Sequence, residues 1–299
     1  MKKKVSVGSA AYCFGPYAIN PVPIKTVIEE VGKMGFDGIS LGGFKPHVHP
    51  DLYPTRDDRK RLVRMIKSNN LEVVEYGADL WSLNSLTQTD DYFKLFEKFK
   101  EFVVDCGFTM MRIDSGAPPI LPDDMSYETA LGKVTDLFCK VSDEAEREGI
   151  TILWEFEPGF IFNKPSEVIE IYKNVNRKNF KILLDTCHAN MCAVVGARQL
   201  GEKETLKGGV IEFIEMLKDK IGLVHLIDSD NTLHDDDTST HTPFGLGVLN
   251  FEEIIPEILK AGYAEKWWVI DLCFWPNAWE VTRQCKEFVD KLNNKYCVD

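Results

Sequence analysis

The stretch Thr151-Ile152-Leu153-Trp154-Glu155-Phe156-Glu157-Pro158-Gly159 is a short apolar run that ends in two acidic residues and breaks at Pro-Gly. Side chains alternate along a β-strand, so Glu155 and Glu157 are expected on the same face. Two like charges at the end of an apolar strand are costly unless a positive group lies beside them. A metal ion is the simplest such group, so this stretch predicts a metal-binding strand end.

Three later segments repeat this pattern of an apolar run followed by residues that commonly bind metals. They are Leu183-Leu184-Asp185-Thr186-Cys187-His188, Leu223-Val224-His225-Leu226-Ile227-Asp228, and Val269-Ile270-Asp271. If the four runs are consecutive strands of one barrel, their ends meet on one side of its mouth.

The apolar pattern alternates between β-like runs and helix-like stretches eight times. The predicted strands are 5–13, 36–41, 71–76, 109–113, 151–156, 180–184, 223–227 and 267–271. The predicted helices are 23–34, 56–69, 90–106, 126–147, 165–174, 210–219, 251–261 and 279–293. Eight β-then-α units predict an α/β protein that forms one (β/α)₈ TIM barrel, a single domain over residues 1–299.

An open, doubly wound sheet is the alternative architecture. It usually has fewer strands and carries a Gly-rich phosphate turn, and the sequence contains neither a GxGxxG nor a Walker pattern. The longest irregular stretches, about 43–54, 77–88, 186–207 and 229–249, all follow predicted strands. Barrel enzymes build their active sites on that side, so these loops are expected to surround the site.

Composition limits the classes of partner. The formal net charge of −12 disfavours a nucleic-acid partner, which usually needs a clustered basic face. No apolar run reaches the roughly 18 residues of a membrane span. The eight cysteines form no CxxC pair, which favours free thiols in a reducing cytoplasm. We therefore expect a cytoplasmic protein that binds neither nucleic acid nor membrane.

All six histidines lie at or after the end of a predicted strand, and none lies in a predicted helix. They are His47, His49, His188, His225, His234 and His241. A random scatter would place several in helices, so their positions favour a polar, ligand-rich barrel mouth.

Four residues are the candidate metal ligands: Glu155, Asp185, His225 and Asp271. A neutral imidazole is the commonest metal ligand, and a buried carboxylate needs a partner or a metal. The alternatives are ordinary ion pairs for Glu155 and Asp271 and a structural role for His225. Three carboxylates with one imidazole suit Mn²⁺, or Mg²⁺ or Co²⁺, better than structural Zn²⁺.

Further residues are candidates for contact with the substrate or for moving a proton. Glu157 is an acid/base, substrate-binding or supporting residue, or a solvated loop residue, and His188 is expected just past its strand in a loop. Asp228 would orient His225 or bind substrate. Aromatic residues near the strand ends would form an apolar wall for a sugar or an aglycone, although core packing is the default for each. The full set of substrate-binding candidates is His49, Arg112, Trp154, His188, Asp228 and His241.

These residues resemble the xylose-isomerase-like TIM-barrel superfamily, in particular the sugar phosphate isomerase/epimerase group with its tagatose and psicose 3-epimerases and inosose dehydratases. The resemblance spans nearly the whole chain. The matching motifs are Glu155, Asp185 with His188, His225 with Asp228, Asp271, and the turn Pro243-Phe244-Gly245-Leu246-Gly247. The resemblance implies a metal-dependent sugar isomerase or epimerase that removes a proton next to a metal-bound carbonyl, through an enediolate.

One departure from the family pattern concerns the catalytic carboxylates. The 3-epimerases have a Glu at the end of the eighth strand, whereas this chain has the shorter Asp271. The candidate catalytic residues are therefore Glu155, Glu157, Asp271 and His188, with a loop histidine such as His49 as another possible base.

The resemblance also implies alternatives. A lyase would use the same intermediate, either as an inosose dehydratase or as the large subunit of a C-glycoside deglycosidase, which works with a smaller partner subunit. A sugar-binding barrel without activity and a DNA-repair nuclease of the superfamily are minor alternatives, and the net charge of −12 disfavours the nuclease. We otherwise expect a small-molecule sugar substrate and association between copies of the chain.

Overall fold

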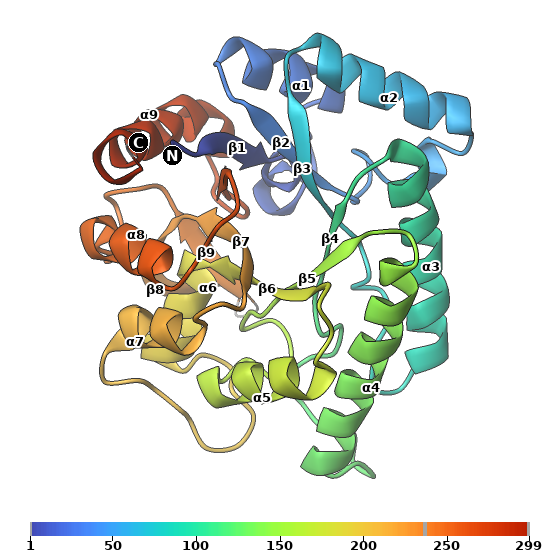
Figure 1. Ribbon diagram of the computed structural model, residues 1–299, viewed down its shortest axis with the longest axis vertical. Helices are drawn as coiled ribbons and strands as arrows, with labels where there is room; N and C mark the ends of the chain where they lie inside the picture. The colour runs from blue at the N-terminus through green and yellow to red at the C-terminus, as the bar shows by residue number, and fades with distance from the viewer. Residues whose placement is uncertain (1, 236–237, 298–299) are drawn as a thin grey trace.

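The chain forms a closed barrel of eight parallel strands, which confirms the predicted (β/α)₈ architecture (Figure 1). The computed structural model describes residues 2–235 and 238–297. Around the barrel the strand order is β1-β10-β7-β6-β5-β4-β3-β2. The strands are β1 (Lys4–Gly8), β2 (Gly38–Gly42), β3 (Glu72–Gly77), β4 (Met110–Ile113), β5 (Thr151–Glu155), β6 (Phe180–Asp185), β7 (Ile221–Leu226) and β10 (Trp267–Ile270).

One long helix follows each barrel strand and packs on the outside of the barrel (Figure 1). These helices are α1 (Ile24–Lys33), α2 (Arg56–Ser68), α3 (Thr89–Cys106), α4 (Tyr127–Glu146), α5 (Pro165–Val175), α7 (Gly209–Met216), α8 (Phe251–Lys260) and α9 (Ala278–Tyr296). Local sequence sets their ends. At the start of α2 the Thr55 hydroxyl accepts from the Asp58 amide at 3.2 Å, and α3 ends at Gly107, whose φ of +71° suits glycine.

Two predictions for segments at the mouth of the barrel, residues 5–13 and 186–207, are wrong. The predicted first strand over 5–13 ends at Gly8, and two short 3₁₀ turns follow it, η1 (Ala10–Tyr12) and η2 (Gly15–Tyr17). The stretch 186–207 begins with helix α6 (Thr186–Asn190) and the π-helical turn η4 (Met191–Val195). His188 is therefore in a helix, not in a loop.

The stretch 229–249 contains a β-hairpin instead of an irregular loop. Its strands are β8 (Asp228–His234) and β9 (Thr238–Thr242), and residues 236–237 of this stretch lie outside the described residues. The hairpin was missed because Asp228-Ser229-Asp230-Asn231-Thr232 shows no apolar alternation.

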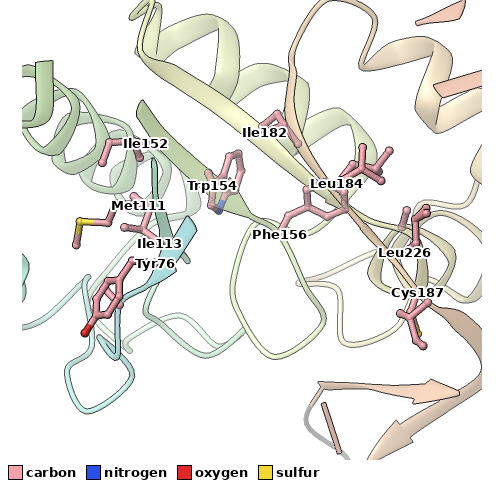
Figure 2. Packing of buried hydrophobic residues seen from close by; sticks show 14 of the residues in the cluster. Tyr76, Met111, Ile113, Ile152, Trp154, Phe156, Ile182, Leu184, Cys187 and Leu226 are labelled. Atoms are coloured by element: carbon pink, nitrogen blue, oxygen red, sulfur yellow. The ribbon is translucent and has the colours of Figure 1, made fainter. Parts of the chain in front are cut away.

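The barrel wall separates two apolar cores. The inner core consists of Val74, Leu153, Leu183, Leu223, Trp267 and Val269. The outer core lies between the strands and the helices, and Figure 2 shows part of it, with Trp154 between Ile152 and Phe156 along β5 and near Ile182 of β6. Alternation along β5 therefore directs Leu153 and Glu155 inward and Trp154 outward.

Strand register brings the candidate residues to one level. Asp185 pairs with His225 across β6 and β7, and His225 pairs with Val269 across β7 and β10. Asp271 is two residues beyond Val269 and so reaches the mouth on the same face. The inner apolar core closes the barrel below this level.

All eight cysteines of the chain are free thiols in the structure, as expected from their spacing. Among the residues that the structure describes, no helix combines the length and the apolar character needed to cross a membrane.

Candidate metal centre and active site

The four predicted metal ligands meet at the mouth of the barrel. Glu155 ends β5, Asp185 ends β6, His225 lies near the end of β7 and Asp271 follows β10 directly. Each offers one ligand atom, and these four atoms all lie within 4.8 Å of one another. All four side chains are buried, with exposed fractions of 1 to 7%. Because adjacent parallel strands end side by side, four distant segments of the chain form one acidic cluster.

Three atoms of this cluster are buried and have no hydrogen-bond partner among the described residues: Glu155 Oε1, Asp185 Oδ2 and His225 Nδ1. His225 Nδ1 lies 3.3 Å from Glu155 Oε1 and 3.5 Å from Asp271 Oδ2. Buried polar atoms are normally paired. Buried nitrogen and oxygen atoms that face one another without hydrogen-bond partners suit the coordination of a cation. The role of these residues as ligands stays a prediction.

The other oxygens of the two aspartates are held by main-chain amides. Asp185 Oδ1 accepts from the amides of Cys187 at 2.8 Å and His188 at 2.9 Å, and so caps helix α6. Asp271 Oδ1 accepts from the Cys273 amide at 2.9 Å. Each carboxylate is thus fixed through one oxygen while the other faces the cluster.

Glu75, on β3, orients His225 and was missed in the sequence. His225 Nε2 donates to Glu75 Oε1 at 2.5 Å, and the Ser40 hydroxyl donates to the same oxygen at 2.7 Å. Because Nε2 is held by Glu75, Nδ1 is the nitrogen that faces the cluster and would offer its lone pair to a cation in place of a proton. The signal was present, because Glu75 interrupts the apolar run Val73-Val74-Glu75-Tyr76 in the manner of the opening stretch.

Arg112 of β4 supplies the positive charge beside Glu155. Its guanidinium contacts Glu155 Oε2, and both side chains are largely buried. Burial alone would raise the pKa of Glu155, but the charges of Arg112 and His225 outweigh it and hold that pKa below its usual range. Arg112 lines the pocket as predicted for a substrate contact, yet its guanidinium is engaged by Glu155.

Glu157 lies just beyond the end of β5 and is 3% exposed, so it is not a solvated loop residue. The Thr238 hydroxyl donates to its carboxyl group. Burial, followed by repulsion from Glu155, raises the pKa of Glu157 to about 8. Glu155 and Glu157 therefore differ in protonation although they stand two residues apart on one face.

His188 and His241 lie together at the same mouth, with ring centroids 4.9 Å apart. His188 Nδ1 is 2.8 Å from the Ser239 hydroxyl, and its Nε2 is 3.9 Å from Glu157 Oε2. Burial, and then the charge of His241, lowers the pKa of His188 to about 3. His188 is therefore a neutral imidazole in reach of Glu157.

His241 of β9 lies between Asp185 Oδ1 and Asp271 Oδ1, the two oxygens that the main-chain amides hold. Its Nδ1 is 3.5 Å from Asp271 Oδ1 and its Nε2 is 3.9 Å from Asp185 Oδ1. Burial opposes its charge, but Asp185 and Asp271 together raise the pKa of His241 to about 9. Neighbouring Cys187 could also approach a cation, but burial raises its thiol pKa well above the usual value.

These residues line one pocket with an acidic floor and an aromatic rim. Its lining includes Glu75, Arg112, Glu155, Glu157, His188, His225, Thr238, His241 and Asp271 at the floor and Phe14, Phe44, Trp81 and Phe274 at the rim. The empty volume is about 570 Å³, including space open to solvent.

The family model described as xylose isomerase-like TIM barrel matches residues 28–286 of the chain. The chain belongs to this family. Fructoselysine 3-epimerase of Escherichia coli O157:H7 is 20% identical over 257 residues, which cover 81% of this chain and 83% of that protein.

Two further comparisons found similar proteins. The uncharacterized protein MJ1311 of Methanocaldococcus jannaschii is 30% identical over 128 residues, which cover 42% of this chain and 38% of that protein. The solved structure of the IOLI protein with a bound zinc atom has a TM-score of 0.71 and 18% identity. That match covers 98% of this chain and 99% of the other, and it shows a shared fold.

Trp154 of this family member does not reach the pocket, so the predicted substrate contact is wrong. The side chain is fully buried in the outer core, with its ring centroid 5.3 Å from that of Phe138 and 6.2 Å from that of Phe180 (Figure 2). The same alternation that places Glu155 at the mouth directs its neighbour away from it.

His49 and Asp228 lie outside the lining of this pocket, and their contacts with a substrate stay predictions. His49 Nδ1 accepts from the Asp51 amide at 3.2 Å, at the start of the turn η3 (Pro50–Leu52). Asp228 accepts from the amides of Gly245 at 3.0 Å and Gly247 at 3.1 Å. The side chains of His49 and Asp228 therefore stabilise loops through these hydrogen bonds.

Proposed function

We propose that this chain is a metal-dependent isomerase or epimerase that moves a proton next to the carbonyl of a ketose or oxo-sugar. The observation that carries the proposal is the convergence of four strand ends in one buried cluster, in which Glu155, Asp185 and His225 each have an atom without a hydrogen-bond partner among the described residues. Glu155, His225 and Asp271 of this cluster also line the acidic pocket. The similarity to fructoselysine 3-epimerase agrees with a sugar substrate.

Glu155, Asp185, His225 and Asp271 would hold a divalent cation. Three carboxylates and one imidazole favour Mn²⁺, Mg²⁺ or Co²⁺, and the zinc in the IOLI structure makes Zn²⁺ the alternative to test. A cation bound there would polarise a carbonyl oxygen and acidify the neighbouring C–H group.

The side chains around this floor would handle the proton. A carboxyl group with a pKa of about 8 is mostly protonated at pH 7, so Glu157 would donate a proton to the substrate. Glu155 and Asp271 are ionised and would accept the proton from carbon. The family resemblance implies this role for Glu155, whereas Asp271 is shorter than the glutamate of the 3-epimerases. His188, a neutral imidazole beside Glu157, would bind a sugar hydroxyl.

A lyase is the second candidate function, and the position of Glu157 is the observation that favours it. Glu157 lines both the acidic pocket and a larger pocket outside it. A protonated carboxyl group at this boundary would be placed to protonate a leaving group that occupies the outer space. Loss of that group, in place of proton return to carbon, would distinguish elimination from isomerisation.

Deuterium exchange tests the proposal. The chain is incubated in D₂O with Mg²⁺, Mn²⁺, Co²⁺ or Zn²⁺ and a panel of ketoses, inososes and 3-oxo-glycosides, and the metal is removed before ¹H NMR. We expect deuterium uptake at one carbon next to the carbonyl of one sugar class. Uptake without group loss supports the isomerase, and group loss supports the lyase. No uptake from any sugar with any of these metals would refute both activities.

A further inference from the structure

A second pocket adjoins the acidic pocket on its outer side. Its empty volume is about 1500 Å³, including space open to solvent, against about 570 Å³ for the acidic pocket. The two share five lining residues, which are Phe14, Trp81, Glu157, Thr238 and Phe274. A group attached to a sugar ring in the acidic pocket would therefore extend into the outer pocket without leaving the protein surface.

Four aromatic rings from four separate loops line the outer pocket. Phe14 follows β1, Trp81 follows β3, Phe160 follows β5 and Phe274 follows β10. Ring centroids are 5.1 Å apart for Phe14 and Trp81, 5.7 Å for Trp81 and Phe160, and 5.2 Å for Phe14 and Phe274. All four rings are partly exposed to solvent. Tilted and edge contacts among them leave ring surface available to a further aromatic group.

Two of these rings, those of Trp81 and Phe274, are positioned by a hydrogen bond or by the backbone conformation in addition to apolar packing. Trp81 Nε1 donates to the buried carboxylate of Asp114, which fixes the plane of the indole. Phe274 has a φ of +67°, a conformation that bulky residues rarely adopt. A Cβ at Gly15 would lie 2.8 Å from the Phe274 ring, so the absence of a side chain there admits this ring. The loops thus present the rings in fixed positions.

The chemistry of the lining excludes a phosphate group as the occupant. Among the described residues, no Lys or Arg lines this pocket, and its ionisable groups are Glu157, His234 and Asp235. Neutral hydrogen-bonding side chains, Ser82, Asn84 and Gln88, lie on the same wall as Trp81. This combination suits a flat apolar group that carries hydroxyl or carbonyl oxygens.

We propose that the outer pocket binds an aromatic group covalently attached to the sugar, so that the substrate class is an aryl-substituted sugar. This inference rests on the proposed function, because it places the sugar ring in the acidic pocket. Phe160, Ser82, Asn84 and Gln88 line only the outer pocket, so a free monosaccharide in the acidic pocket would leave them without a partner.

Equilibrium binding tests this inference without any turnover. Isothermal titration of the full chain with Mg²⁺ compares 4-methylumbelliferyl β-D-glucopyranoside, methyl β-D-glucopyranoside and free 4-methylumbelliferone, none of which is an oxo-sugar. We expect the aryl glucoside to bind about tenfold or more tightly than either of the others, because both pockets contribute.

Variants locate the aryl group. Phe160→Ala should weaken aryl glucoside binding about tenfold, the loss of one aromatic contact, and change methyl glucoside binding less than about twofold, because Phe160 lines only the outer pocket. Trp81→Ala, which removes a ring from the rim of both pockets, should weaken aryl glucoside binding at least as much. Phe93→Ala is the matched control, because Phe93 is a partly buried ring on α3 outside both pockets. Circular dichroism verifies that each variant is folded, and Trp81→Phe, which keeps a ring, should retain most of the binding.

Three results would overturn the inference: equal binding of the aryl and methyl glucosides, equal binding of the free aglycone and its glucoside, or no effect of either variant. The proposed function and the outer-pocket inference can fail separately. If no sugar exchanges deuterium but the aryl glucoside still binds more tightly than the methyl glucoside, the proposed reaction alone is refuted. If deuterium exchange occurs but the two glucosides bind equally, the outer-pocket inference alone is refuted.

Discussion

At the scale of single residues, the candidate metal centre depends on one oriented imidazole. His225 Nε2 is bonded to Glu75, and this bond leaves Nδ1 facing Glu155 and Asp271. A histidine can offer only its unprotonated nitrogen to a cation. Glu75 therefore decides which nitrogen is available, although it is not itself one of the four candidate ligands.

Removing the charge of Glu75 should weaken metal binding. Glu75→Gln can accept the same hydrogen bond, but it stabilises the required tautomer less and makes the imidazole less basic. We expect Mn²⁺ affinity measured by calorimetry to fall about 10–100-fold, the usual effect of such supporting carboxylates. Glu72→Gln, an exposed position on the same strand, is the control. Unchanged affinity in Glu75→Gln would contradict this role.

His47 provides a pH-dependent prediction away from the cluster. It is buried, and its Nε2 donates to the Val22 carbonyl at 2.8 Å. Burial lowers the pKa of His47 below 6.5, so the unfolded chain takes up this proton at a higher pH than the folded chain. The contribution of neutral His47 to stability is therefore present above about pH 6.5 and is lost as the pH falls through the folded pKa.

Urea unfolding of the wild type and His47→Gln at pH 7.5 and pH 5.5 isolates this contribution. Glutamine keeps an N–H donor for Val22 but does not titrate. We expect the stability of the wild type relative to the variant to be lower at pH 5.5 than at pH 7.5. An equal difference at the two pH values would show that His47 does not titrate in this way.

At the scale of elements, the four strands that carry the candidate metal ligands were predictable, and the short elements at the mouth of the barrel were not. Apolar runs and 3.6-residue periodicity identify eight strands and eight helices, because burial sets both patterns. Helix α6 has five residues and no periodicity, and it depends on Asp185 as its cap. The prediction that Trp154 contacts the substrate was wrong for a different reason. The same alternation that puts Glu155 and Glu157 on one face of the strand puts Trp154 on the opposite face.

The loop after the β8–β9 hairpin should depend on Asp228. Its carboxylate accepts from three amides of this loop, those of Gly245, Gly247 and Leu249, at 3.0, 3.1 and 2.9 Å, and from the neighbouring Ser229 amide at 2.9 Å. Asp228→Ala leaves these donors unpaired, and we expect a loss of about 2–4 kcal/mol in the free energy of unfolding. Asp230→Ala should cost less, because among the described residues the Asp230 carboxylate accepts hydrogen bonds only from nearby Thr232. Equal losses in denaturant titrations would contradict the anchoring role.

At the scale of the whole molecule, barrel closure makes the site. Residues 155 and 271 are far apart in sequence, but β5, β6, β7 and β10 are consecutive in the barrel. The order of the four motifs was therefore sufficient to predict their convergence. Sequence order did not reveal Glu75, because β3 reaches His225 across the barrel, nor the position of His241, because the hairpin that carries it lacks a periodic pattern.

Metal binding should stabilise the whole barrel, because the site exists only in the folded chain. A cation at about 100 times its dissociation constant adds about 2.7 kcal/mol to the free energy of unfolding. We expect thermal unfolding of the metal-free chain to shift upward by several degrees on addition of Mn²⁺. The shift should be absent in His225→Ala, and an equal shift in that variant would indicate binding elsewhere.

The most direct test of the central claim is a Mn²⁺ titration of the metal-free chain, followed by the electron paramagnetic resonance signal of free Mn²⁺. Asp185→Asn keeps the shape of the side chain and removes one charge from the cluster, whereas Asp136→Asn makes the same change at an exposed position on α4. We predict one site per chain in the wild type and in Asp136→Asn, and about 100-fold weaker binding in Asp185→Asn, the loss of about 2.7 kcal/mol. No site in the wild type, or equal binding by Asp185→Asn, would contradict the account.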